Sequence, residues 1–182
     1  MKRWDLQGKR ALVTGGTRGI GAAVVSEFEA LGADVLVVAR NVDEGPRSVQ
    51  ADVSEPSGRE RIVQAVDSRW GAIDIVVNNA GMNIRKPWTQ LTAEEQVAVI
   101  GTNLLGPADL LRRLHPHLCQ GTTPAVVNVA SVAGFVDVGS GAAYALSKAA
   151  LLQLSRSLAV KWSVDGIRVN AVAPWYVNTP LT

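Results

Sequence analysis

Residues 9–28 read KRALVTGGTRGIGAAVVSEF, a short apolar segment followed by a glycine-rich turn and the start of a helical pattern. Glycine permits a tight turn and lets backbone N–H groups approach a ligand closely. The N-terminus of a helix favours a bound anion such as a pyrophosphate. The glycines are spaced G-x-x-x-G-x-G, which differs from the G-x-G-x-x-G of the usual dinucleotide fingerprint. The stretch therefore predicts a phosphate-binding turn between a strand and a helix.

The next predicted strand, residues 33–39, indicates which dinucleotide this turn would hold. Such a strand ends about 20 residues after the turn in an acid that binds the ribose of NAD, or offers an arginine for the phosphate of NADP. Here the strand leads to Arg40 with no acid at positions 38, 39 or 40, and Arg18 lies in the glycine-rich turn. Two guanidinium groups suit a phosphate dianion, which arginine binds bidentately. The pair predicts NADP(H), and two solvated surface arginines are the alternative interpretation.

Three further apolar segments, at 73–77, 125–130 and 167–173, are separated by helical patterns. This alternation predicts an α/β fold built on a parallel sheet. Ligands of open parallel sheets bind outside the carboxyl ends of the strands. The glycine-rich turn, the sequence NNAG at 78–81 and Ser131 all fall at such ends.

Tyr144 and Lys148 stand four residues apart, so a helix would place them on one face. A free tyrosine titrates near pH ~10, and lowering its pKa by ~3 units requires about 4 kcal/mol. One cation ~4 Å away supplies about that much in a partly screened site. The spacing therefore predicts that Lys148 lowers the pKa of Tyr144. Alone, so short a pattern is typical of an ordinary amphipathic helix, and the other motifs change that interpretation.

Together, these motifs resemble the short-chain dehydrogenase/reductase family over the whole chain. The likeness lies in T-G-x-x-x-G-x-G at 14–21, NNAG at 78–81, Ser131, Tyr144-x-x-x-Lys148 and the turn after Pro174. The sequences WDLQGK at 4–9 and APWYVNTPL at 173–181 resemble the tropinone-reductase-like branch in particular. The resemblance implies a Rossmann-type doubly wound parallel sheet flanked by helices, in a single NADP-binding catalytic domain over residues 1–182.

The same resemblance implies a role for each matching residue. Tyr144 would give a proton to a carbonyl oxygen or take one from an alcohol, and Ser131 would bind that oxygen. Lys148 would bind the nicotinamide ribose and lower the tyrosine pKa, and Asn103 would anchor a water-linked proton relay. The implied cofactor-binding residues are Gly15, Thr17, Arg18, Gly19, Ile20, Gly21, Arg40, Asp52, Val53, Asn79, Ala80, Gly81, Tyr144, Lys148, Val177 and Thr179.

Two features depart from the family pattern. Only seven residues, 41–47, separate Arg40 from the predicted strand at 48–51, which is too few for a crossover helix. We expect that flank of the sheet to be uncovered or covered by a loop, with a looser adenine pocket. Trp175 stands where the family usually has glycine, which is tolerable if its φ is negative. We expect Trp175 to line the nicotinamide or substrate pocket.

The implied activity is that of an NADPH-dependent carbonyl reductase or alcohol dehydrogenase. Intact Ser131, Tyr144, Lys148 and Asn103 argue against one alternative, a non-catalytic dinucleotide-binding sensor or scaffold. Arg18 and Arg40 disfavour the other, an NAD-dependent alcohol dehydrogenase of the same fold. An apolar or cyclic ketone is suggested by Ile84, Val136, Val138, Trp175 and Tyr176.

Composition agrees with this assignment. The chain has 182 residues, 47% of them hydrophobic, and no apolar run is longer than six residues, against the ~18 that a membrane span requires. The formal charge of +2, without a basic patch, gives little support to nucleic-acid binding. We see no signal peptide, and a single cysteine, Cys119, excludes an internal disulfide and fits the cytoplasm. We expect a homodimer or homotetramer without membrane partners.

Two expectations concern a metal and the chain end. His115-Pro116-His117 has no third ligand nearby in the sequence, so we interpret it as the end of a helix and predict no metal site. Family members usually continue beyond the last predicted strand with a substrate lid, a helix and a further strand. Without them that strand would be an exposed edge. We therefore expect the natural protein to extend several tens of residues past Thr182.

Overall fold

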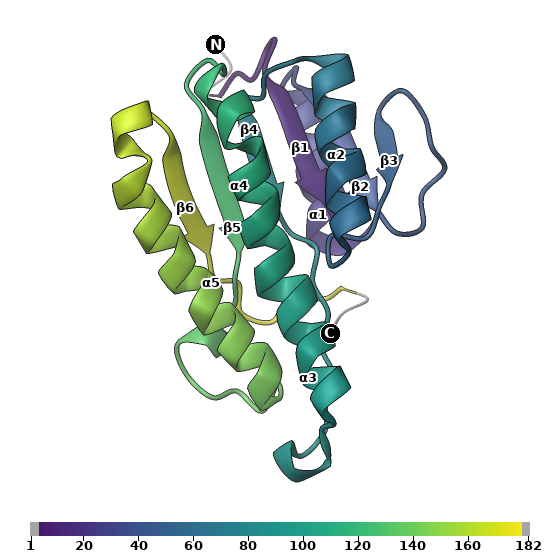
Figure 1. Ribbon diagram of the computed structural model, residues 1–182, viewed down its shortest axis with the longest axis vertical. Coiled ribbons are helices and arrows are strands. Elements are labelled where there is room, and N and C mark those ends of the chain that lie inside the picture. Colours follow the sequence, from purple (N-terminus) through teal and green to yellow (C-terminus); the bar gives the residue numbers. More distant parts are fainter. Residues whose placement is uncertain (1–3, 180–182) are drawn as a thin grey trace.

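The computed structural model describes residues 4–179 and contains a six-stranded parallel sheet in the order β3-β2-β1-β4-β5-β6 (Figure 1). This order is that of a doubly wound sheet, so the predicted Rossmann-type fold is confirmed. The direction of winding reverses between β1 and β4, where such sheets bind ligands. The strands are β1 (Arg10–Thr14), β2 (Asp34–Ala39), β3 (Ser48–Gln50), β4 (Ile75–Asn78), β5 (Ala125–Val129) and β6 (Arg168–Val172).

Helices cover the two faces of the sheet unequally. Figure 1 shows α2, α4 and α5 in front of the strands and α1 behind them. No helix within residues 4–179 is both long and apolar enough to cross a membrane. The α-helices are α1 (Gly19–Ala30), α2 (Pro56–Arg69), α3 (Ala93–Ile100), α4 (Gly106–Cys119) and α5 (Ala142–Lys161). The shorter helical turns are η1 (Trp88–Gln90), η2 (Gly101–Leu105), η3 (Val132–Gly134) and η4 (Ser163–Asp165).

The alternation of side chains along β1 divides the apolar core into two layers. Leu12 points toward the layer that holds Ile62 of α2 and Leu114 of α4. Its neighbour Val13 points to the opposite layer, with Phe28 of α1 packed against that layer. Successive strand residues face opposite sides of a sheet, so a continuous apolar strand is needed where both faces are covered.

The connection from β2 to β3 contains no helix, as its length predicted. Residues 40–47 form a loop, closed by a bridge between Gly45 and Ser48. At the other end of the described sheet, β6 is an edge strand, and Val172 retains 45% of its surface exposed. The face of the sheet that carries α1 is therefore less covered, at both of its edges, than the face that carries α2, α4 and α5.

A buried ion pair aligns the starts of β1 and β4. Asp74 is 1% exposed and accepts hydrogen bonds from the backbone and guanidinium of Arg10 at 2.8–3.1 Å. It also accepts one from the backbone of Thr122 at 2.6 Å, just before β5. Burial alone would raise the pKa of Asp74, but these hydrogen bonds hold it below its ordinary value. One carboxylate thus joins the amino ends of three strands.

Candidate active site

A groove of about 470 Å³ lies at the carboxyl ends of the central strands. All the predicted cofactor-binding residues line it except Gly21, Tyr144, Lys148 and Val177. The sequence did not predict several of the lining residues, because only the folded structure brings them to the groove. The lining residues are Gly15, Thr17, Arg18, Gly19, Ile20, Val38, Ala39, Arg40, Asn41, Ala51, Asp52, Val53, Asn79, Ala80, Gly81, Thr102 and Thr179.

The glycine-rich turn leaves room that larger residues would fill. Gly15 has φ +66°, a conformation that favours glycine, and a Cβ there would lie 2.9 Å from the amide nitrogen of Asn79. A Cβ on Gly21 would lie 2.2 Å from the carbonyl oxygen of Gly15, so Gly21 supports the turn from behind the groove. The first turn of α1 has no acidic residue, and Arg18 makes no side-chain cap. The N-terminal N–H groups of α1 therefore suit a phosphate, and the residues present fit a dinucleotide.

The end of β4 holds the turn in place. The hydroxyl of Thr14 accepts hydrogen bonds from the backbone N–H groups of Asn79 and Ala80 at 3.1 and 3.0 Å. The side-chain amide of Asn79 donates to the carbonyl oxygens of Thr14 and Gly15, both at 3.0 Å. The NNAG sequence thus braces the glycine-rich turn across the switch point of the sheet.

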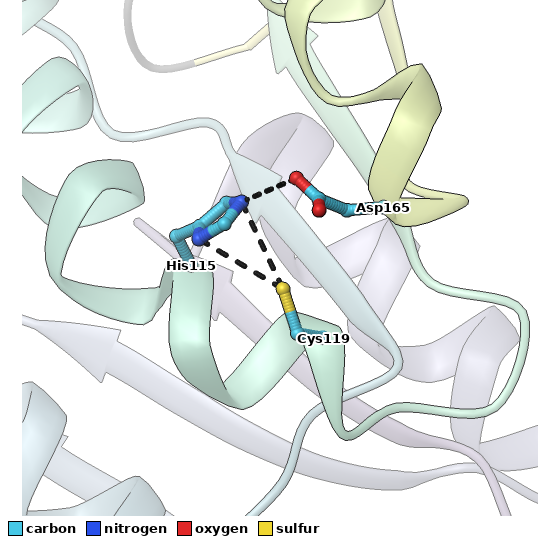
Figure 2. A group of neighbouring side chains, drawn as sticks. All are labelled: His115, Cys119 and Asp165. Carbon is cyan, nitrogen blue, oxygen red and sulfur yellow. Dashed lines mark hydrogen bonds and ion pairs between the residues drawn. The ribbon is translucent and has the colours of Figure 1, made fainter.

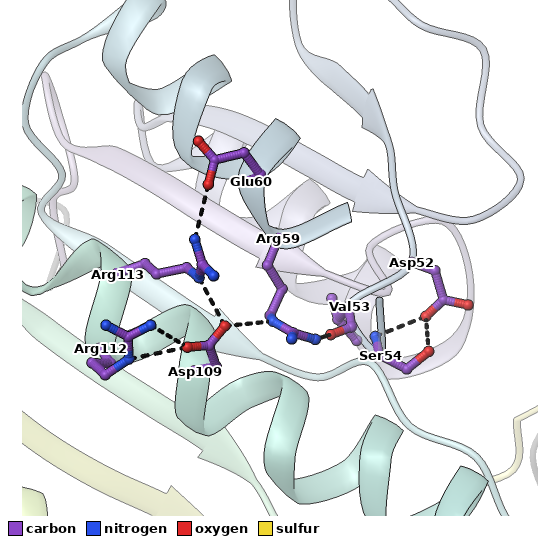
Figure 3. A network of polar contacts seen from close by, with 8 residues as sticks. All are labelled: Asp52, Val53, Ser54, Arg59, Glu60, Asp109, Arg112 and Arg113. Atoms are coloured by element: carbon purple, nitrogen blue, oxygen red, sulfur yellow. Dashed lines mark hydrogen bonds and ion pairs between the residues drawn. The ribbon is translucent and has the colours of Figure 1, made fainter. Parts of the chain in front are cut away.

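Arg18 and Arg40 both line the groove, as predicted. The guanidinium of Arg40 lies 3.9 Å from the carboxylate of Asp52, and its side chain is 63% exposed. An exposed pair at this distance is weak, so Arg40 can turn to another anion. Asp52 is itself held by the backbone N–H and hydroxyl of Ser54, which donate to it at 2.9 and 2.7 Å (Figure 3).

A charged network behind the groove fixes the backbone at Val53. Figure 3 shows Arg59 of α2 bridging the carbonyl oxygen of Val53, at 2.8 Å, and the carboxylate of Asp109 in α4, at 2.7 Å. Arg112 and Arg113 also donate to Asp109. The hydrogen bond from Arg113, with those from its other two partners, holds the pKa of Asp109 far below its usual range despite partial burial. The network fastens α2 to α4 beneath this end of the groove.

A second, smaller cavity brings Ser131 and Tyr144 together. Trp175 lines it as expected, and its φ is not positive, since Thr123 is the one non-glycine residue of the described chain with a positive φ. Asn83 and Arg85 were missed from the sequence, because their loop has no distinctive pattern. The lining residues are Asn83, Arg85, Ser131, Val132, Ala133, Val138, Ser140, Tyr144, Pro174, Trp175 and Tyr176.

The predicted apolar substrate contacts divide into two groups. Val138, Trp175 and Tyr176 line this cavity. Ile84 instead packs against a small core cluster, and Val136 is 55% exposed outside the cavity lining. These two residues therefore do not line the cavity: Ile84 is packed inward from the loop before η1, and Val136 is exposed in the loop after η3.

The pKa of Tyr144 is raised above its ordinary value, contrary to the prediction from its spacing to Lys148. Burial raises it most, because the phenolate loses its hydration. A hydrogen bond with Ser131 and the positive charge of Arg85 oppose this effect without reversing it. Tyr144 is therefore a protonated phenol at neutral pH, in the form that donates a proton.

The Lys148 ammonium is bonded to the backbone and lies over the ring of Tyr144. It donates to the carbonyl oxygen of Val129 at 2.8 Å and lies 5.5 Å from the centroid of the Tyr144 ring. Burial lowers the pKa of Lys148 to about 8, so the ammonium is still mostly protonated at pH 7 but loses its proton within about one pH unit above it. A Cβ on Gly81 would lie 3.6 Å from this ammonium. Lys148 thus stands between the groove at Gly81 and the cavity at Tyr144.

Asn103 occupies a π-helical turn, η2, where a continuous α-helix was expected. It is fully buried and outside the linings of both cavities. Its amide donates to the carbonyl oxygen of Met82 at 2.9 Å and to the hydroxyl of Ser147 at 3.0 Å, and its oxygen accepts from the N–H of Met82 at 2.8 Å. Ser147 in turn donates to the carbonyl oxygen of Tyr144 at 2.7 Å. In this structure, the Asn103 side chain positions the segment after Gly81 and the helix that carries Tyr144.

Comparisons with known proteins agree with this geometry. The family model described as short chain dehydrogenase matches residues 9–182. A tropinone reductase homolog of Arabidopsis thaliana is 41% identical over 99% of this chain and 74% of its own length. The Pseudomonas aeruginosa RhlG/NADP active-site complex has a TM-score of 0.91 and 33% identity, covering 98% of this chain and 76% of that one. A 4-hydroxyisoleucine dehydrogenase complexed with NADH has a TM-score of 0.88 and 28% identity, covering 95% and 76%.

Proposed function

The chain belongs to the short-chain dehydrogenase family, and on this basis we propose that it is an NADPH-dependent carbonyl reductase. It would reduce a ketone or aldehyde to an alcohol, or catalyse the reverse reaction, within one catalytic domain. The observation that carries this proposal is the placement of Lys148 between a groove built for phosphates and a cavity that holds Ser131 and Tyr144. A sensor or scaffold has no need of such a proton-transfer set.

The residues of the cavity would handle the proton and orient the substrate. When bound, NADPH would supply the hydride. Tyr144 is neutral at pH 7 and would donate its proton to the carbonyl oxygen, a step typically worth ~10²–10⁴-fold. Ser131, within hydrogen-bonding reach of the phenol, would hold the same oxygen. Lys148, with a pKa of about 8, would exchange a proton near neutral pH and bind the ribose.

Arg18 and Arg40 support the choice of NADPH over NADH. Each charge-assisted contact to a phosphate contributes about 1.5–3 kcal/mol. We therefore expect a preference of at least ~2 kcal/mol, which is about thirtyfold in the dissociation constant. The RhlG structure holds NADP, whereas the 4-hydroxyisoleucine dehydrogenase structure holds NADH. The arginines, and not the fold, carry this part of the proposal.

The cavity beside Tyr144 supports a small apolar or cyclic carbonyl substrate. Val138, Trp175 and Tyr176 give it apolar walls, and the rings of Trp175 and Tyr176 meet edge to face at 5.6 Å. Arg85 adds one guanidinium to the lining. We further propose that the protein acts in the cytoplasm as a homodimer or homotetramer. Sedimentation of the purified protein and fractionation of its cells test these two points.

Turnover measurements over a panel of cyclic ketones, aldehydes and alcohols test the proposed function. We expect ketone-dependent oxidation of NADPH, with a dissociation constant for NADPH well below that for NADH. Tight NADPH binding without turnover of any compound would support the sensor alternative. Equal dissociation constants for the two cofactors would instead contradict NADPH selection, and faster alcohol oxidation with NAD would support the NAD-dependent alternative.

A further inference from the structure

Three side chains with different metal-binding atoms meet where α4 ends. His115 and Cys119 lie four residues apart in the last turns of α4, and Asp165 closes the short turn η4 before β6. Figure 2 shows the three side chains converging. Their ligand atoms all lie within 4.8 Å of one another. The fold thus supplies His115 with two neighbouring ligands, one of them 50 residues away in the sequence.

The distances approach those of a zinc site. The Nε2 atom of His115 lies 3.0 Å from an oxygen of Asp165 and 3.8 Å from the sulfur of Cys119. In a tetrahedral zinc site, nitrogen and oxygen ligands are about 3.3 Å apart, and sulfur and nitrogen ligands are about 3.6 Å apart. Both observed distances differ from these values by only a few tenths of an ångström. The sulfur of Cys119 and the carboxylate of Asp165 lie within 4.8 Å of each other, so these two exposed side chains would have to rotate toward each other, to about 3.6 Å, to complete the coordination.

We propose that His115, Cys119 and Asp165 bind a zinc ion, with water as the fourth ligand. A thiolate, an imidazole and a carboxylate are the ligand types that zinc accepts. The ring of His115 packs on Trp162 with centroids 4.8 Å apart, which limits its rotation. The side chains of His115 and Asp165 are 30% and 36% exposed, so an ion can reach them.

The same three residue types could form a nucleophile with its base, but the geometry disfavours that interpretation. In a catalytic triad, the nucleophile and the acid contact opposite nitrogens of the imidazole. Here Asp165 contacts Nε2, and the sulfur of Cys119 is equally far, at 3.8 Å, from both ring nitrogens. Neither ring nitrogen is therefore positioned to accept a proton from the thiol alone. A metal ion beside Nε2 would instead contact all three groups.

The ion would link two segments remote from the proposed catalytic residues. α4 ends shortly before β5 begins, and η4 immediately precedes β6, so the cluster lies toward the amino ends of the strands (Figure 1). None of its residues lines the two cavities described above. We therefore expect zinc to stabilise the packing of α4 against the η4 turn without taking part in the reaction.

Titration of the full chain with Co²⁺ and Zn²⁺, under conditions that keep Cys119 reduced, tests this site. We expect a thiolate-to-cobalt charge-transfer band that Zn²⁺ removes by competition, and a rise in the melting temperature with Zn²⁺. Cys119→Ser should abolish the band, and Asp165→Asn and His115→Ala should each weaken Zn²⁺ binding at least tenfold. Ketone reduction should be the same with and without Zn²⁺.

His117→Gln is the matched control, because His117 lies two residues from His115 but contacts Asp67 at 2.6 Å instead. It should keep the cobalt band and the affinity for Zn²⁺. Melting curves without metal will establish that each variant is folded. Absence of the band in the wild-type protein, or equal Zn²⁺ affinity in the wild type and the three ligand variants, would overturn the proposal.

Discussion

The side-chain amide of Asn103 donates a hydrogen bond to the hydroxyl of Ser147 over 3.0 Å, and both residues are fully buried. This contact joins the π-helical turn η2 to α5, the helix that carries Tyr144 and Lys148. The π-helical turn is an interruption of the kind often found at functional sites. Ser147 also donates to the carbonyl oxygen of Tyr144, so the position of the proposed proton donor depends on this pair.

Replacing Ser147 by alanine should therefore affect both stability and catalysis. The substitution leaves the amide of Asn103 with one partner fewer in a buried site, which costs about 1–3 kcal/mol of unfolding free energy. We expect kcat for ketone reduction to fall about tenfold, since small displacements of catalytic groups are costly. Denaturant unfolding and steady-state kinetics measure the two effects.

Ser155→Ala is the matched control for this variant. Ser155 is buried on the same helix, accepts a hydrogen bond from the amide of Asn128 at 2.8 Å, and donates to the carbonyl oxygen of Leu151 at 2.7 Å. Its loss should cost similar stability but leave kcat close to that of the wild type. Similar losses of kcat in the two variants would show that Ser147 has no special role in positioning Tyr144.

Tyr144→Phe should abolish turnover while leaving the affinity for NADPH within a few-fold of the wild type. The phenol donates the proton in the proposed reaction but contributes little to the proposed cofactor site. Tyr176→Phe removes a phenol from the same cavity, where its side chain is 65% exposed, and should leave kcat within a few-fold. If Tyr144→Phe keeps more than a tenth of kcat, another group donates the proton.

Arg40→Asp should shift the cofactor preference toward NADH. The change removes one predicted phosphate contact and places a second carboxylate near Asp52, which repels a phosphate dianion. Arg156→Asp changes the net charge by the same amount at an exposed residue of α5 that does not line the groove, and should leave the preference unchanged. Dissociation constants for both cofactors, measured by fluorescence, decide the outcome. An unaltered ratio in Arg40→Asp would exclude this arginine from cofactor selection.

The ion pair of Asp74 with Arg10 should make stability depend on pH. The folded pKa of Asp74 is depressed below the unfolded value of about 3.9. Its contribution is therefore present above about pH 4 and is lost as the pH falls through the folded pKa. Asp74→Asn should lower the unfolding free energy at pH 7 by about 3 kcal/mol.

The difference between Asp74→Asn and the wild type should begin to shrink below about pH 4, where the carboxylate of the unfolded wild-type chain becomes protonated, and should disappear below the depressed folded pKa. Denaturant unfolding between pH 7 and pH 3 measures this convergence. Asp43→Asn serves as a control, because Asp43 is exposed in the β2–β3 loop. A difference that stays constant over this range would contradict the assigned role of the carboxylate.

Local patterns predicted the architecture and the phosphate-binding turn, and the family resemblance added most of the other groove residues. The glycines at 15, 19 and 21 predict a strand–turn–helix unit because backbone geometry and helix-terminus charge act over a few residues. The length of 41–47 excluded a crossover helix, because each helical residue rises only 1.5 Å and parallel strands need a long return path. These properties depend on residues that are close together in the chain, so they can be predicted from the sequence.

Contacts between distant residues could not be predicted in this way. The direction of the Lys148 ammonium depends on the carbonyl of Val129, and the pKa of Tyr144 depends on how deeply the ring is buried. The i,i+4 spacing places two residues on one face but does not determine the dielectric around them. The sign of the tyrosine shift was therefore wrong when it was inferred from spacing alone.

The residues and the family resemblance were enough to predict the doubly wound sheet, the phosphate-binding turn and the helix that pairs Tyr144 with Lys148. The packing of distant segments was needed to show that Asn103 contacts Ser147, that Arg85 lines the same cavity as Tyr144, and that Asp165 contacts His115. Local backbone geometry sets relationships within a turn or a helix. The packing of whole elements sets distances, burial and charge between them, and these quantities govern the chemistry of a site.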